Sequence, residues 1–205
     1  MKNLLAVLIS LALLVGFTVS TASAGIYISG NLGAVFVDDA DIKDDGERAK
    51  FTFDTGGAAT FAVGTTIGSA VRVEAEIGGR VSDCDKYKYD GSSWKLDGDV
   101  TTVSYMANAY YDFKNESRYT PFVGGGLGVA NVEYDIDKID GDKINEKDDD
   151  NVMAYQIILG GSFAATERLN IDLQYRYFAT KDPDLFGADL EYQSHNVMLG
   201  LRYNF

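Results

Sequence analysis

Few side chains in this sequence could perform nucleophilic or metal chemistry, because its 205 residues include one histidine and one cysteine. His195 follows Ser194 and lies close to Glu191, which together are the residue types of a Ser-His-acid hydrolase. Adjacent residues of a β-strand point to opposite faces, so Ser194 and His195 cannot meet if this segment is a strand. We therefore expect no enzyme activity and no cofactor, with a lipid-modifying enzyme as the weaker alternative.

Three further motifs specify no catalytic or metal site. Cys84 has no partner for a disulfide or a Cys-based zinc site, so it is interpreted as a tolerated loop thiol. The glycine-rich run 124–128 lacks the G-x-G-x-x-G spacing and is interpreted as small residues that face bulky ones in a narrow interior. Residues 133–150 hold nine acids but fail the EF-hand pattern at Ile136. A solvated acidic loop with a hairpin turn at Asp140-Gly141 is expected, and loose binding of Ca²⁺ or Mg²⁺ is the alternative.

The first 24 residues have the pattern of an export signal. Lys2 precedes a nearly uncharged apolar run over residues 4–19, and Ala22-Ser23-Ala24 is a small-x-small cleavage site. We expect a signal peptide over residues 1–24, a mature domain over residues 25–205, and an uncleaved anchor as the alternative. No later segment approaches 18 consecutive apolar residues, so no transmembrane helix is predicted.

The mature chain alternates apolar and polar residues, which is typical of strands with two different faces. Residues 71–81 show this most clearly, since apolar residues alternate there with Arg72, Glu74, Glu76 and Arg80. Each alternating segment reaches the roughly 9–11 residues that a tilted membrane strand needs. The predicted strands cover residues 26–37, 55–67, 71–81, 100–113, 122–132, 152–164, 169–180 and 192–205.

The connections between these segments alternate in length, with short turns at one end and long loops at the other. This asymmetry is typical of an outer-membrane barrel with periplasmic turns, although a soluble β-sandwich would show the same alternation. Outward aromatic residues form two belts, as expected at the two membrane interfaces. We predict an all-β fold, an eight-stranded antiparallel up-and-down transmembrane barrel with both termini in the periplasm. The belts hold Tyr111, Phe113, Phe163, Tyr203 and Phe205 at the turn end, and Tyr105, Tyr155, Tyr175 and Tyr177 at the loop end.

Charged residues within the predicted strands fall on the polar face, which must point inward because lipid cannot solvate them. Four arginines and four acids balance each other, and an eight-stranded interior is just wide enough for side chains to fill. The sequence therefore predicts a closed structural network, with a narrow ion-conducting path as the alternative. Its members are Arg72, Glu74, Glu76, Arg80, Asp112, Asp172, Arg176 and Arg202.

Five segments carry a family resemblance: residues 27–33 (YISGNLG), 72–78 (RVEAEIG), 106–113 (MANAYYDF), 121–128 (PFVGGGLG) and 194–205 (SHNVMLGLRYNF). With eight strands placed, the mature chain resembles the small outer-membrane β-barrel proteins of the opacity-protein and surface-antigen type. The alternating Leu199, Leu201, Tyr203 and Phe205 resemble the C-terminal signal read by the barrel-assembly machinery. The resemblance implies a non-enzymatic surface protein whose four loops serve adhesion, host or matrix contact, or an antigen role. A small porin is the main alternative.

The formal net charge of −13 argues against binding nucleic acid. The four long connections (38–50, 82–99, 133–150 and 181–191) hold 24 acidic and 10 basic residues, a net charge of −14, so the strands and turns are neutral. We therefore expect a monomer in the lipid bilayer with an acidic extracellular surface. Such a surface prefers cationic partners or divalent bridges to lipopolysaccharide, and its binding weakens with salt.

Overall fold

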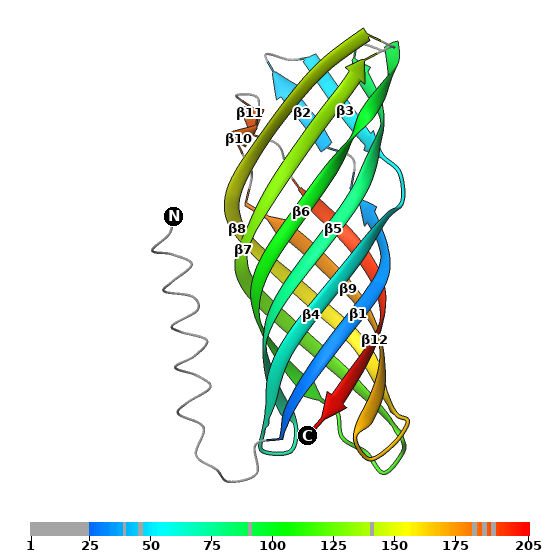
Figure 1. Cartoon of the computed structure of the whole chain (residues 1–205), viewed down its shortest axis with the longest axis vertical. Coiled ribbons are helices and arrows are strands. Elements are labelled where there is room, and N and C mark those ends of the chain that lie inside the picture. The colour runs from blue at the N-terminus through cyan, green and yellow to red at the C-terminus, as the bar shows by residue number, and fades with distance from the viewer. Residues whose placement is uncertain are drawn as a thin grey trace.

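The computed structural model describes residues 25–38, 40–44, 47–89, 92–139, 142–181, 184–185, 188–189 and 192–205. Eight antiparallel strands form a tall barrel with inclined strands (Figure 1). They are β1 Ile26–Val37, β4 Gly56–Ile67, β5 Val71–Tyr89, β6 Ser92–Asp112, β7 Tyr119–Ile139, β8 Asp142–Ala164, β9 Leu169–Thr180 and β12 Gln193–Asn204. The predicted fold class and the number and order of the strands are confirmed.

The barrel closes where its first strand pairs with its last. β1 pairs with β4 on one side and with β12 on the other, and the closing register runs from Tyr27 opposite Asn204 to Val37 opposite Ser194. Each remaining strand pairs with its neighbours in sequence order around the barrel. We call the β1–β12 contact the seam.

The segments expected to be long loops are largely β-structure, which corrects the sequence interpretation. β5 and β6 continue to Tyr89 and Ser92, and β7 and β8 continue to Ile139 and Asp142. Ile139 pairs with Asp142, whereas the hairpin turn predicted at Asp140-Gly141 lies outside the described residues. Residues 38–50 contribute β2 (Ala40–Asp44) and β3 (Glu47–Phe53), and the last loop contributes β10 (Asp184–Leu185) and β11 (Ala188–Asp189). Aromatic and β-branched residues in these segments favour strand over loop.

Side chains alternate between a buried lumen and an exposed outer face along the barrel strands. Apolar residues on the outer face are exposed, as a lipid-facing surface requires; Leu32 is 69% and Leu127 66% exposed. The Thr66 amide donates a hydrogen bond to the Gly25 carbonyl, and the Phe205 amide donates one to the Ile26 carbonyl. Gly25 and Phe205 therefore lie at the same end of the barrel, the end with the short turns. Within the described residues, no helix is long and apolar enough to cross a membrane.

Glycines make room for large side chains inside the barrel. Tyr27 lies opposite Gly64, and Tyr110 lies opposite Gly124, where an added Cβ would come within 2.5 Å of the tyrosine Cδ1 atom. The same small-opposite-large arrangement recurs at Asn31–Gly200, Asn108–Gly126, Met106–Gly128, Phe122–Gly160 and Met198–Gly33. The inward glycines of the run at 124, 126 and 128 therefore leave room for bulky side chains on β6, as the sequence predicted.

Two local interpretations were wrong in detail. The strand predicted over residues 122–132 begins earlier, at Tyr119, so Pro121 lies within β7 opposite Gly161. Cys84 lies in β5 rather than in a loop, and its side chain is buried. In both places the pairing between strands continues beyond the residues that show the lipid-facing alternation. The expected signal peptide, residues 1–24, lies outside the described residues.

Candidate functional site

The periplasmic half of the lumen is built around an arginine held by acids and aromatic rings. The Arg72 Nε donates to both Asp112 carboxylate oxygens at 3.0 and 3.1 Å. Glu74 lies 3.6 Å from another Arg72 nitrogen. The guanidinium carbon lies 4.4 Å from the centre of the Tyr110 ring and 5.0 Å from that of Phe122. Cation–π contact and a two-oxygen ion pair thus fix this cation in place.

Two more ion pairs lie in the lumen. The Arg202 Nε lies 3.0 Å from an Asp172 oxygen, and the Arg202 guanidinium carbon lies 5.4 Å from the centre of the Tyr27 ring. Arg176 Nη1 donates to both oxygens of Glu76 at 2.8 and 2.7 Å, and Gln156 adds a hydrogen bond of 3.1 Å to the same carboxylate. The side chains of Arg176 and Glu76 are 1% and 0% exposed. Buried charges need such partners, because water cannot solvate them here.

Arg80 differs from the other three arginines. Among the described residues no carboxylate lies within ion-pair distance of it; it donates instead to Asn196 at 3.2 Å and to Ser104 at 3.1 Å. Its guanidinium carbon lies 3.8 Å from the centre of the Phe178 ring. All eight charged residues proposed from the sequence are thus buried in the lumen, but seven of them form ion pairs and Arg80 does not.

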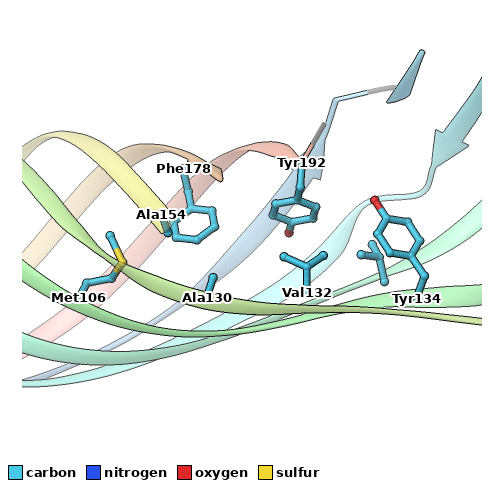
Figure 2. Packing of buried hydrophobic residues seen from close by; sticks show 8 residues of the cluster. Met106, Ala130, Val132, Tyr134, Ala154, Phe178 and Tyr192 are labelled. Atoms are coloured by element: carbon cyan, nitrogen blue, oxygen red, sulfur yellow. The ribbon is translucent and has the colours of Figure 1, made fainter. Parts of the chain in front are cut away.

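An apolar cluster closes the lumen on the extracellular side of Arg80. Figure 2 shows Met106, Val132 and Tyr134 facing Phe178 and Tyr192 across the barrel. The sequence interpretation missed this cluster, although the pattern contains a signal for it. Beyond residue 129 of β7 the polarity of the two faces is exchanged. The apolar residues Ala130, Val132 and Tyr134 now point inward, and the polar residues Asn131, Glu133 and Asp135 point outward.

The inversion marks the place where the strands leave the lipid. A lipid-facing wall is apolar outside, whereas a water-facing wall is polar outside and apolar inside. The same change occurs on β6 between Val103 and Thr101, and on β8 between Met153 and Asn151. The extracellular half is therefore a water-soluble β-structure with its own core, continuous with the membrane barrel.

A small void lies within the charged network of the lumen. The void between Arg72, Glu74, Asp172 and Arg176 measures about 10 Å³, roughly the space of one water molecule. The apolar cluster lies beyond Arg80, toward the extracellular end.

The proposed catalytic residues are not brought together. Ser194 is fully buried in the lumen, whereas His195 lies on the outer face, so the two face opposite sides of β12. His195 contacts Tyr175 and Asp38 instead. Glu191 lies outside the described residues, and among those described no three His, Cys, Asp or Glu side chains could together hold a metal ion.

The outward face of the extracellular strands is acidic. Asp83 lies opposite Asp99, and Asp99 lies opposite Asp135, so three aspartates stand side by side on β5, β6 and β7. Lys147 on β8 lies opposite Asp135, with its Nζ 3.9 Å from an Asp135 oxygen and 2.9 Å from a Glu133 oxygen. Its bond to Glu133 raises the pKa of Lys147. We call Asp83, Asp99 and Asp135 the aspartate row; like charges directly opposite destabilise a sheet.

The four C-terminal residues singled out from the sequence share the outward face of the last strand. Leu199, Leu201 and Tyr203 lie on β12, and Phe205 follows it. All four are exposed, with Phe205 71% exposed. Their side chains are therefore available to lipid or to a partner at the periplasmic end.

Comparison with known proteins identifies the family of this chain. The family model for the outer membrane protein beta-barrel domain matches residues 9–205. The chain belongs to this family. It is 27% identical over 239 aligned residues to the outer membrane protein PagN of Salmonella typhimurium, with all of both chains covered. It is 30% identical over 207 residues to a Rickettsia conorii protein named "Putative adhesin RC1281", covering 87% of this chain and 81% of that one.

A solved structure agrees with the fold. The crystal structure of Neisserial surface protein A superimposes with a TM-score of 0.61 at 18% identity, covering 90% of this chain and all of the other. This family member is therefore an outer-membrane β-barrel, and its long strand extensions lie on the extracellular side. The predicted family type and location are confirmed.

Proposed function

We propose that this outer-membrane barrel is a non-enzymatic surface adhesin whose acidic extracellular strands bind cationic surfaces on host cells or matrix. The aspartate row carries the proposal. Cross-strand pairs of like charge destabilise a sheet by a few tenths to about 1 kcal/mol each, and among the described residues only Asp135 of the row has a nearby base, Lys147. An acidic face attracts basic partners and speeds their encounter.

The proposal includes a lumen closed by its charged network and apolar cluster, which leaves the extracellular end as the working surface. Loops and edges on a rigid scaffold commonly carry recognition. The relatives point the same way, since one is named as an adhesin and none of those cited is named as an enzyme. The proposal also includes export by residues 1–24, assembly through the C-terminal signal at Phe205, and a monomeric state in the membrane.

Adhesion of bacteria that display the protein tests the proposal. The variant Asp83→Asn/Asp99→Asn/Asp135→Asn removes three charges while keeping side-chain size and hydrogen-bonding capacity. We expect adhesion to cultured cells and to basic matrix proteins to fall severalfold, while the folded barrel becomes more stable. Glu116→Gln, at an exposed periplasmic turn, is the matched control and should leave adhesion unchanged. Equal adhesion by the triple variant would overturn the proposal.

A further inference from the structure

A polar and aromatic group of side chains stands on the lipid-facing side of the seam. His195 lies at its centre: the Tyr175 hydroxyl bonds to the His195 Nδ1 at 2.5 Å, and the His195 Nε2 lies 3.3 Å from an Asp38 oxygen. The Tyr177 hydroxyl donates to Gln193 at 2.6 Å. We call these five residues the seam cluster. A hydroxyl thus faces one ring nitrogen of His195, and a carboxylate faces the other.

The rings of the seam cluster form a continuous face. Tyr175 and His195 are stacked with centroids 5.9 Å apart and planes at 25°, and the Tyr177 ring centre lies 5.4 Å from that of His195. Tyr155 extends the face, 6.3 Å from Tyr177. The side chains remain accessible, since Tyr155 is 42%, Tyr175 40% and the His195 side chain 39% exposed. Their edges carry hydroxyl, amide and carboxylate groups.

The seam cluster lies at the outer membrane interface. His195 is ten residues from Phe205, which for a strand tilted by about 40° is a height of about 25 Å, the height of the apolar band of such barrels. It also lies where the outward pattern turns from apolar to polar, because Val197 below it is apolar and Gln193 above it is polar. The outer-leaflet headgroups are therefore at its level.

Among the described residues, the next strands around the barrel from β1 carry no such group. The outward residues of β4 and β5 near their extracellular ends are small or apolar: Ala59, Phe61, Gly79 and Val81. Tyr105, on β6, is a belt tyrosine of similar exposure (43%) for which no ring partner or ion pair is found among the described residues. A membrane belt alone explains scattered tyrosines, but it does not explain a histidine and a carboxylate locked into a ring stack at the seam.

We propose that the seam cluster is a binding site for the sugar headgroup of an outer-leaflet glycolipid. A pyranose offers an apolar C–H face, which packs on aromatic rings, and hydroxyls, which donate to carboxylate and amide oxygens. An acyl chain would pack on the rings but could form no hydrogen bonds with the hydroxyl, amide and carboxylate edges, and a phosphate would face the Asp38 carboxylate. The nearest described base on the same face of β9, Lys181, lies beyond the cluster at the end of the strand.

Titration of the purified protein with lipid A in zwitterionic detergent micelles tests the site. The chain has one histidine, so with a tag free of histidine its imidazole NMR signals report on His195 alone. We expect these signals to shift with native and with dephosphorylated lipid A, and not with phosphatidylcholine. Tyr175→Leu removes one stacking and hydrogen-bonding group. We expect this variant to bind lipid A about tenfold more weakly, which corresponds to about 1.4 kcal/mol, and the affinity is measured by thermal shift.

Three variants keep the test decisive. Tyr175→Phe removes only the hydroxyl and should weaken binding less than Tyr175→Leu does, while Tyr105→Leu is the matched belt control and should bind like the unmodified protein. The gel shift between unheated and boiled samples verifies that each variant is folded. The proposal is overturned if only phosphorylated lipid A binds, if phosphatidylcholine produces the same shifts, or if Tyr105→Leu loses as much affinity as Tyr175→Leu.

Discussion

Breaking the central ion pair of the lumen should destabilise the barrel strongly. Glu76→Gln keeps the shape and the acceptor for Gln156 but leaves the guanidinium of Arg176, 1% exposed, without its carboxylate. Removing one partner of a buried pair costs about 3–5 kcal/mol, a large share of the 5–15 kcal/mol typical of folded proteins. With a slope of about 2–3 kcal/mol per molar urea, the unfolding midpoint should fall by about 1.5 M.

The double variant Glu76→Gln/Arg176→Met separates an unpaired charge from a simple loss of packing. It removes both charges and retains an apolar stem, so it should recover at least half of the lost stability. Equilibrium urea unfolding in micelles, read by the gel shift of unheated samples, gives the three midpoints. Glu116→Gln at a periplasmic turn is the control and should match the unmodified protein. The reasoning is refuted if the single variant keeps its midpoint or if the double variant is no more stable than the single one.

Three further predictions follow from the packing. Gly124→Ala should cost about 1–3 kcal/mol because its Cβ meets Tyr110, whereas Gly57→Ala, with open space around it, should unfold at the normal midpoint; equal midpoints would contradict the fitted-glycine account. Burial and the carboxylates of Asp99 and Asp83 raise the pKa of the Cys84 thiol to about 12, so maleimide should label the folded protein slowly at pH 8 and the denatured protein quickly; fast labelling of both would place the thiol at the surface. Planar-bilayer recordings should show no reproducible openings, and steady openings altered by Arg72→Gln would favour a pore.

The membrane part of the fold could be predicted from the sequence because lipid imposes a strict rule. Charges such as Glu74 cannot face hydrocarbon, so a period of two fixes both the strand and the direction of each side chain. The lumen charges were found for the same reason. Their partners could not be assigned, because pairing depends on the three-dimensional register; nothing in the sequence says that Arg80 takes Ser104 and Asn196 while Arg176 takes Glu76.

The extracellular half was misread because the rule changes where water replaces lipid. Tyr134 is predicted in a loop, yet it joins Val132 in a core inside continued strands. The exchanged polarity of residues 130–135 indicates such a core, but a search for strands with apolar outward residues does not detect it. The seam cluster was missed for another reason: Asp38 and His195 are far apart in sequence and meet only because the barrel closes.

Salt dependence of binding by the purified barrel tests the central claim most directly, that the acidic extracellular strands and not the lumen carry the function. The protein in lipid nanodiscs is passed over immobilised basic matrix protein at increasing salt, beside the triple variant of the aspartate row. The Debye length falls from about 10 Å at 0.1 M to about 3 Å at 1 M, so binding should weaken steeply with salt and should be weak at every salt concentration in the variant. Binding that is independent of salt and equal in both proteins would contradict the account.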